Sequence, residues 1–220
     1  MGQATVGVDT QVVPAASQRR ERWRNGAGWT REIFAARDDG DPSSSWCWRL
    51  SIAEIDADAA FSSFPGVDRE LVLLSGNGLR LCFAGGETVE LLRPHDSLRF
   101  PGERALTGAL VDGPTTDFNL MWRRDAVEAS LWRRPLVGAM VLFVDPGDTW
   151  AVHVLAGHAT FDARCGLPAL AAGDTALLGA SGRRERFPLV GGGEALMMRI
   201  SPLASPGASD AAGPGPAPSR

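Results

Sequence analysis

Short runs of alternating apolar and polar residues recur along most of this chain. Alternation with a period of two predicts half-buried β-strands. Turn signals such as Ser75-Gly76-Asn77-Gly78 and Asp112-Gly113-Pro114 separate the runs, and we find no segment with the periodicity of a long amphipathic helix. The pattern therefore predicts an all-β protein of mostly antiparallel strands. Strands are expected over residues 46–53, 69–74, 79–83, 88–92, 98–100, 104–111, 117–123, 137–144, 150–155, 159–161, 175–178, 186–190 and 194–200.

The two ends of the chain lack this pattern. Residues 201–220 are mostly Pro, Gly, Ala and Ser, so we expect a disordered tail, because too little apolar surface is present to offset the entropy of ordering. Residues 1–17 are expected to be a weakly ordered segment, although residues 10–13 could add an edge strand. The patterned core of the chain then extends from residue 18 to residue 200.

A weak internal repeat divides this core into two units. Leu73-Leu74-Ser75-Gly76 followed by Asp96-Ser97-Leu98 matches Val154-Leu155-Ala156-Gly157 followed by Asp174-Thr175-Ala176. An apolar pair that ends in Gly, with an Asp at a later turn into another strand, resembles the cupin barrel. The prediction is a duplicated cupin-like barrel, a bicupin, with a first barrel over residues 18–134 and a second, smaller barrel over residues 135–200.

Composition narrows the classes of function. The chain has 220 residues with 44% hydrophobic content, enough for a substantial core, and a formal net charge of −4. That charge gives no general attraction to nucleic acid or to anionic lipid, so neither is expected as a partner. All 22 basic residues are Arg, which excludes Schiff-base chemistry and any lysine base. No secretory leader or membrane-span pattern is recognised, which predicts a cytoplasmic protein.

Two short runs combine charged, amide and aromatic groups: residues 23–32 (Trp-Arg-Asn-Gly-Ala-Gly-Trp-Thr-Arg-Glu) and residues 117–124 (Asp-Phe-Asn-Leu-Met-Trp-Arg-Arg). Such a mixture is more typical of a ligand site than of a core. The Gly-x-Gly spacing of the first run is no nucleotide fingerprint, because GxGxxG, a Walker Lys and a following helix are all missing. These runs are therefore the main candidates for a small-molecule site.

An ordered series of motifs resembles the HutD/Ves family over roughly residues 20–200. The resemblance implies a bicupin-like β fold, an association with bacterial histidine utilisation and no firmly established catalytic activity. Ala27 departs from the glycine usual at its position. The motifs are Trp23-x-Asn25-Gly26-x-Gly28-x-Thr30-Arg31-Glu32, the strand of residues 48–53, Phe61-Ser62-x-Phe64-Pro65-Gly66-x-Asp68-Arg69, Asp112-Gly113-Pro114 and Asp117-Phe118-Asn119-x-Met121-x-Arg123-Arg124.

Metal binding is the first function to test against a cupin-like pattern. Counting back from Gly76, the position of the usual cupin Glu ligand falls on Arg69, and the positions of the paired His ligands fall in residues 62–65, which contain no ligand. The equivalent positions of the second unit, Trp150 and residues 143–145, cannot form such a site. The three histidines, His95, His153 and His158, and the three cysteines, Cys47, Cys82 and Cys165, show no metal-binding spacing. We predict no bound metal and no cofactor.

Strand parity suggests where a site would form. Arg49 and Ser51 point away from Trp48, Leu50 and Ile52, while the polar positions of residues 117–123 alternate with Phe118, Leu120 and Trp122. If both polar faces point into the first barrel, they converge with Arg69 in a pocket rich in donors; if they point outward, they are a solvated surface. Arg69 could also pair internally with Asp68, Glu70 or Asp117. The predicted ligand-binding residues are Asn25, Thr30, Glu32, Arg49, Ser51, Phe64, Arg69, Asp117, Asn119 and Arg123.

Three functions fit these observations. The leading hypothesis is a metal-free bicupin that binds a small carboxylic acid, with formylglutamate, an intermediate of histidine degradation, as the family suggests, in a regulatory or accessory role. The second is a cupin-type isomerase or hydrolase that uses Glu32 or Asp117 as base. The third is a structural protein with a vestigial pocket and a dimer surface; a homodimer is a possible assembly in any case.

Overall fold

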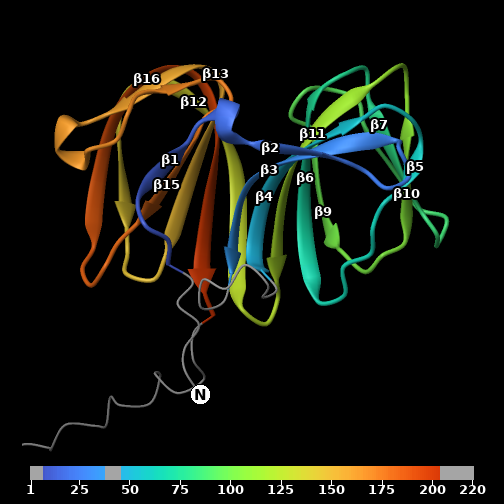
Figure 1. Cartoon of the computed structure of the whole chain (residues 1–220), viewed down its shortest axis with the longest axis horizontal. Helices are drawn as coiled ribbons and strands as arrows, with labels where there is room; N and C mark the ends of the chain where they lie inside the picture. The colour runs from blue at the N-terminus through green and yellow to red at the C-terminus, as the bar shows by residue number, and fades with distance from the viewer. Residues whose placement is uncertain (1–6, 38–45, 204–220) are drawn as a thin grey trace, which may run out of the picture.

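The chain folds into two β-lobes that lie side by side (Figure 1). The computed structural model describes residues 7–37 and 46–203. Within these residues the regular structure is β-strand, apart from the single 3-10 turns η1 (Ala15–Ser17) and η3 (Ala163–Cys165). The strand pairs of the described residues are antiparallel, as the sequence pattern predicts.

The first lobe consists of two sheets. Its six-stranded sheet has the order β2-β3-β4-β11-β6-β9, and its four-stranded sheet has the order β5-β10-β7-β8. The larger sheet has long central strands and short edge strands, and β4 and β11, which carry the alternating segments 48–53 and 117–123, are neighbours at its centre. The strands are β2 (Arg19–Arg22), β3 (Gly28–Arg37), β4 (Trp46–Ile55), β5 (Ala59–Ala60), β6 (Val67–Ser75), β7 (Leu79–Phe83), β8 (Thr88–Leu91), β9 (Ser97–Pro101), β10 (Leu106–Leu110) and β11 (Thr115–Arg123).

The second lobe is one six-stranded sheet with the order β1-β15-β13-β16-β12, to which β14 adds by pairing with β13. The first strand of the chain belongs to this lobe, because β1 pairs with β15 as the edge strand expected near residues 10–13. The chain then crosses to the first lobe and returns through β12. The strands are β1 (Gln11–Val13), β12 (Val127–Val144), β13 (Thr149–Phe161), β14 (Leu170–Ala171), β15 (Thr175–Gly179) and β16 (Glu185–Pro202).

Three boundaries differ from the sequence prediction. The expected division between residues 134 and 135 falls inside β12, which pairs with β16 without interruption from Val127 to Val144. The segment of residues 1–17 contributes β1 and η1, and residues 1–6 lie outside the described residues. Of the segment 201–220 expected as a tail, Ser201 and Pro202 belong to β16, and residues 204–220 lie outside the described part of the chain.

The cupin-like architecture consists of open sheets. Each sheet of the described residues ends in edge strands, β2 and β9 in the six-stranded sheet of the first lobe, and does not close on itself as a barrel would. The duplicated barrels of the sequence prediction are therefore two lobes of facing or curved sheets. Antiparallel sheets of this kind bury one face and leave the other available for another layer.

Apolar side chains form three cores, one inside each lobe and one between them. The core between the lobes contains Trp48, Leu50 and Ile52 of β4 together with Phe118 and Leu120 of β11, packed against the second-lobe residues Ala151, Leu177, Leu196, Met198 and Ile200. Because neighbouring side chains of a strand point to opposite faces, the intervening residues of β4 and β11 point into the first lobe. The polar face of the sheet is thus inside.

The internal repeat of the sequence corresponds to matched hydrogen bonds. The amide of Leu73 donates to the carbonyl of Asp96 at 2.9 Å, and the amide of Val154 donates to the carbonyl of Asp174 at 3.0 Å. His95 and Gly173, which precede these aspartates, donate in turn to the carbonyls of Leu73 and Val154, and both have positive φ, 74° and 91°. The two lobes therefore share one turn geometry, in which a His occupies a glycine-type conformation in the first lobe.

Candidate functional site

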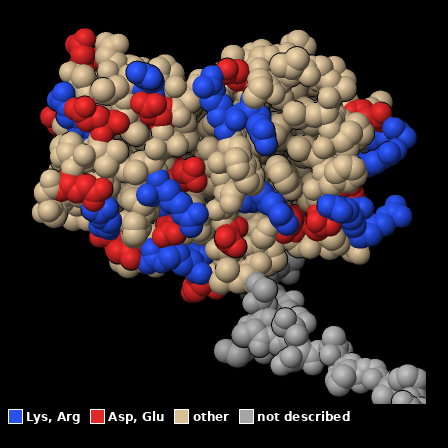
Figure 2. Space-filling model, turned by 180° about the vertical axis from the view of Figure 1, so that it is seen from behind, with Lys and Arg blue, Asp and Glu red and all other residues tan. Residues whose placement is uncertain are grey.

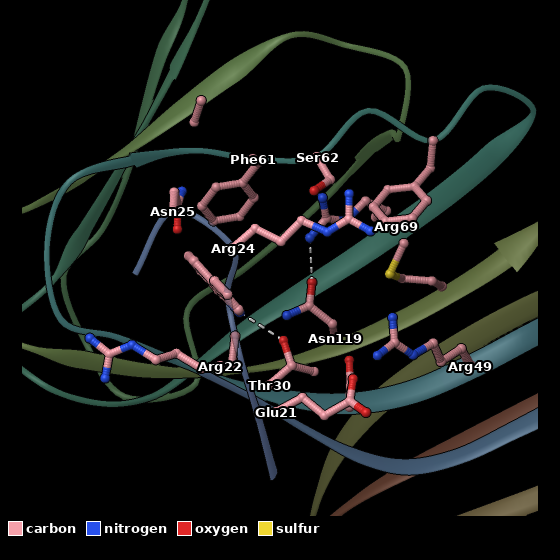
Figure 3. Close-up of a pocket in the computed structure, with 16 residues that line it drawn as sticks. Glu21, Arg22, Arg24, Asn25, Thr30, Arg49, Phe61, Ser62, Arg69 and Asn119 are labelled. Atoms are coloured by element: carbon pink, nitrogen blue, oxygen red, sulfur yellow. Dashed lines mark hydrogen bonds between the residues drawn. The ribbon is translucent and has the colours of Figure 1, made fainter. Parts of the chain in front are cut away.

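A pocket of about 520 Å³ opens into the first lobe, on the polar face of its larger sheet (Figure 3). That volume lies within the range of sites for small ligands. Four arginines and one glutamate line it, together with neutral polar and aromatic groups. The lining residues are Glu21, Arg22, Trp23, Arg24, Asn25, Thr30, Arg49, Ser51, Ala53, Ala60, Phe61, Ser62, Phe64, Arg69, Asn119 and Met121.

The floor of the pocket follows the register of three neighbouring strands. Met121 of β11 lies opposite Arg69 of β6 on one side and opposite Arg49 of β4 on the other. Asn119, two residues deeper on the same face of β11, lies opposite Ser51. Paired residues of adjacent strands share a face of the sheet, so these side chains lie side by side. The alternation in the sequence correctly groups them.

Arg69 is the buried cation of the pocket, with 6% of its surface exposed. Its Nη2 donates to Asn119 Oδ1 at 2.8 Å, and its guanidinium lies 5.2 Å from the centres of the Phe61 and Phe100 rings and 5.8 Å from that of Phe64. Its Nε has no hydrogen-bond partner among the described residues. Burial lowers the pKa of Arg69 to about 10, opposed by the charge of Asp117 and reinforced by Arg49. The guanidinium remains charged at neutral pH.

Asn119 separates Arg69 from the buried carboxyl of Asp117. The amide nitrogen of Asn119 donates to Asp117 Oδ1, and its oxygen accepts from Arg69, which fixes the orientation of the amide. Asp117 is fully buried, and its Oδ2 has no hydrogen-bond partner within the part of the chain that the structure describes. Burial raises the pKa of Asp117 to about 7, against the lowering effects of Arg69 and of Asn119. Asp117 is thus a weak counter-ion for Arg69.

The turn between β2 and β3 forms one wall. Trp23 Nε1 donates to Thr30 Oγ1 at 2.8 Å, and the Trp23 ring meets Phe61 edge to face at 6.4 Å. Asn25 Oδ1 accepts from the amide of Ala27 at 3.1 Å, an Asx turn. Gly28 is required here, since a Cβ at this position would lie 2.3 Å from the carbonyl oxygen of Glu54. Residues 23–32 therefore both shape the end of the lobe and face the pocket.

The rim carries further positive charge. In Figure 3, Arg22 and Arg24 extend in opposite directions from the end of β2 and the turn that follows it, and Arg49 lies on the floor that β4 contributes. Arg49 Nε lies 2.8 Å from Glu32 Oε2, an ion pair without hydrogen-bond geometry, so part of its charge is already matched. Arg24 is exposed and forms no ion pair with a carboxylate of the described residues. Arginines at two depths of the pocket thus face the same space.

The structure brings together seven of the ten predicted ligand-binding residues: Asn25, Thr30, Arg49, Ser51, Phe64, Arg69 and Asn119. Three do not line the pocket. Glu32 pairs with Arg49, Asp117 lies beneath Asn119, and Arg123 at the end of β11 pairs with Asp125 at 2.9 Å, near a separate surface hollow. Sequence reasoning missed nine of the sixteen lining residues, among them Trp23 and Phe61, which are motif positions, and Arg24, which directly precedes the predicted Asn25.

The second lobe has an apolar interior instead of a comparable polar site. Leu136, Phe161, Leu170, Phe187 and Met197 are among the buried residues that fill it. His153 points toward the core between the lobes, where its Nδ1 lies 2.9 Å from Thr175 Oγ1 and burial lowers its pKa to about 4. No group of three His, Cys, Asp or Glu residues suited to a metal ion occurs within residues 7–37 and 46–203.

Charged side chains are dispersed over the outer surface. Figure 2 shows acidic and basic groups interspersed on one face of the molecule. None of the described residues forms a helix long and apolar enough to cross a membrane.

Taken with the fold, the pocket defines a two-lobed, cupin-like β-protein with an arginine-rich site in its first lobe. The family model HutD matches residues 15–197. This chain belongs to the HutD family, as its motifs suggested.

Curated relatives match part of the chain. An uncharacterised 21.2 kDa protein in the hutC 3′ region of Pseudomonas putida is 38% identical over 121 residues, which are 55% of this chain and 62% of that protein. Protein Ves of Cronobacter sakazakii is 41% identical over 110 residues, 50% of this chain and 58% of Ves. The chain thus matches about three fifths of the length of these relatives.

Solved structures support the same assignment over more of the chain. HutD from Pseudomonas fluorescens SBW25 superposes with a TM-score of 0.76 at 27% identity and covers 89% of this chain and 100% of its own. YhhW from Escherichia coli has a TM-score of 0.64 at 9% identity, over 90% of this chain and 100% of its own, and this likeness shows the fold alone. A second E. coli structure describes YhhW as a bacterial pirin in complex with nickel(II).

Proposed function

We propose that this protein is a metal-free binder of a small carboxylic acid with a regulatory or accessory role in histidine utilisation. The observation that carries the proposal is Arg69, a buried guanidinium in an open pocket that donates its hydrogen bond to a neutral amide. A buried cation is costly unless an anion compensates it, and a carboxylate is the acceptor that matches the guanidinium fork. A bound carboxylate would give Arg69 an anionic acceptor beside the neutral amide of Asn119.

A dicarboxylate of the formylglutamate type suits the arrangement of charges. One carboxylate would bind Arg69 at depth, and the second would lie near Arg24 at the rim. Ser51 and the oxygen of Asn119 lie on the floor of the pocket near Arg69 and can donate to and accept from a formamido group. The hutC-region name of the P. putida relative and the family resemblance point to the same pathway.

The proposal is metal-free because of the residues in the pocket. Arg69 stands at the position expected for the glutamate ligand of a cupin, and a guanidinium repels a cation. The nickel complex of the pirin concerns a protein that shares only the fold.

Calorimetric titration with N-formyl-L-glutamate tests this function. We expect binding that Arg69→Met weakens by about 10- to 100-fold, since a hydrogen-bonded charge pair contributes about 1.5–3 kcal/mol. Arg99→Met is the matched control, because Arg99 lies on the opposite face of the same sheet over Trp122 and pairs with Asp68. Absence of any binding at millimolar concentration would overturn the proposal.

A second measurement separates a binder from an enzyme. In an NMR time course with N-formyl-L-glutamate, a binding protein returns the ligand unchanged. Conversion of the ligand at a rate abolished by Asp117→Asn would favour the isomerase or hydrolase hypothesis instead.

A further inference from the structure

Three buried polar side chains are connected by hydrogen bonds from the lining of the pocket into the interior: Arg69, Asn119 and Asp117, with 6%, 3% and 0% of their surfaces exposed. We propose that Asp117 is the internal counter-ion of Arg69 in the empty pocket, and that binding of a carboxylate to Arg69 is coupled to the uptake of one proton by Asp117. This inference rests on the proposed function. It adds the uptake of one proton by the protein to the binding of the ligand.

The surroundings of Asp117 make it the buried carboxyl whose negative charge can balance the positive charge of Arg69. On β6, Arg69 is the charged group that acts on Asp117; on β4, Ala53 lies opposite Asp117, and the nearest cation along that face is Arg49. The facing sheet contributes the apolar side chains Leu79 and Leu81 of β7, which pack in the same core as Ala53. Within the described residues, Asp117 therefore faces one cation and no other carboxylate.

The hydrogen bonds of Asp117 suit a carboxyl that alternates between charged and neutral forms. Oδ1 accepts from Asn119, whereas Oδ2 is buried without a donor among the residues that the structure describes. An ionised carboxylate loses solvation at Oδ2, and a proton on that oxygen removes the penalty. Burial raises the pKa of Asp117 to about 7, so the change between its ionised and protonated forms takes place near neutral pH. Asn119 accepts from Arg69 in both forms, so the guanidinium stays in place.

The charge balance then determines the coupling. In the empty pocket, Arg69 is positive and Asp117 is ionised at pH 8. A ligand carboxylate on Arg69 would put two anions beside one cation in a buried site, which raises the pKa of Asp117 further. The complex therefore takes one proton from solvent onto Oδ2: protein, anion and proton form an assembly with a neutral Asp117, a cationic Arg69 and an anionic ligand.

The experiment is a titration with N-formyl-L-glutamate at pH 8 in Tris and in triethanolamine, cationic buffers with different heats of ionisation. The difference in observed enthalpy between the buffers gives the number of protons taken up. We expect more than about 0.3 proton per ligand for the unaltered protein, with an affinity that falls as pH rises from 7 to 9.

Asp117→Asn is the decisive variant, because its amide oxygen can still accept from Asn119. We expect proton uptake to vanish and affinity at pH 8 to increase about tenfold, while affinity at pH 6 stays within about twofold, since a proton no longer has to be bound. Asp148→Asn, which alters a buried carboxyl of the second lobe paired with Arg199, is the control and retains the uptake of the unaltered protein.

The outcomes separate the two proposals. Binding without a buffer-dependent enthalpy, or weaker binding by Asp117→Asn at pH 8 while circular dichroism shows it folded, would overturn the proton coupling and leave the carboxylate site standing. No binding by the unaltered protein at either pH would overturn both.

Discussion

Arg69 donates to Asn119 and not to Asp117, although both acceptors lie on the same face of β11. The neutral amide thereby keeps the guanidinium and the carboxyl apart and turns the cation toward the pocket. A direct ion pair at this depth would have neutralised both charges and removed the reason for an anion to bind. The position of a single amide thus decides whether this lobe has a binding site or a structural salt bridge.

Arg69→Met is expected to bind less and yet to unfold at a temperature equal to or above that of the unaltered protein. Burial of a guanidinium costs solvation that a hydrogen bond to a neutral amide only partly offsets, whereas Met packs well among Phe61, Phe64 and Phe100. Thermal unfolding followed by near-ultraviolet circular dichroism at pH 6 checks this. Arg69→Ala should unfold at a lower temperature because it leaves a cavity. A fall of more than about 5 °C for the Met variant would show that Arg69 stabilises the fold.

Two buried groups are expected to give opposite pH dependence of stability. The pKa of Asp117 is raised from 3.8 to about 7, so between these pH values the folded state binds more protons than the unfolded state. The stability that this group contributes is therefore lost as pH rises from about 4 to 7. The pKa of His153 is lowered from 6.5 to about 4, so the unfolded state binds more protons, and stability is lost as pH falls from 6.5 toward 4.

Urea unfolding between pH 4 and pH 7 separates these contributions. Asp117→Asn should become more stable as pH rises from 4 to 6.5, and His153→Gln should become less stable as pH rises from 4 to 7, each by about 1 kcal/mol per pH unit. The unaltered protein should show a flatter profile than either variant. Parallel profiles for all three proteins would contradict the assignment.

His95→Gly is expected to stabilise the protein by about 0.5–1 kcal/mol. His95 has φ of 74°, and the equivalent residue of the other lobe is Gly173, with φ of 91°. The ion pair that this change removes is weak, since His95 Nδ1 lies 3.9 Å from Glu194 Oε2. Chemical denaturation measures the gain. The reciprocal change, Gly173→Ala, should destabilise, because it combines positive φ with a Cβ 3.0 Å from that of Ala15.

Phe118→Ala is expected to destabilise both lobes together, by about 3–5 kcal/mol. Phe118 is fully buried in the core between the lobes, and its ring centre lies 5.0 Å from that of His153 across the interface. Hydrogen exchange detected by mass spectrometry should show faster exchange in β4 and in β13. Phe187→Ala, inside the second lobe only, is the comparison and should affect its own lobe first. A decrease of protection in one lobe alone for Phe118→Ala would contradict a shared core.

The sequence was sufficient for the all-β class, the duplication and the shared polar face of β4 and β11, but the expected strands omitted β2 and β3, although β3 lies between β2 and β4 in the sheet. Alternation on residues 48–53 and 117–123 assigned Arg49, Ser51 and Asn119 to one face, and the pocket shows that this face is inside. Parity determines which residues share a face but not which face is covered. The sequence left that step open, because an arbitrary sandwich more often exposes its polar face, and the packing of β4 and β11 against the second lobe decides it.

Other features depended on contacts that no local pattern encodes. Asp117 and Asn119 have the same parity, yet Asn119 lines the pocket and Asp117 lies fully buried beneath it. Arg123 has that parity as well, but the strand ends there and its side chain meets Asp125. The extension of β12 through residue 135 was missed because Arg133, Arg134 and Pro135 interrupt the apolar alternation on which strand prediction relies.

The first strand of the chain completes the sheet of the second lobe before the chain enters the first. The halves consequently no longer correspond to consecutive stretches of gene, whatever ancestral duplication produced them. A cut between the lobes deprives the later half of a sheet edge that only the opening residues supply. A fragment that begins after β1 would leave β15 as an unpaired sheet edge open to pairing with other chains, so the second lobe depends on the first described strand for a covered edge.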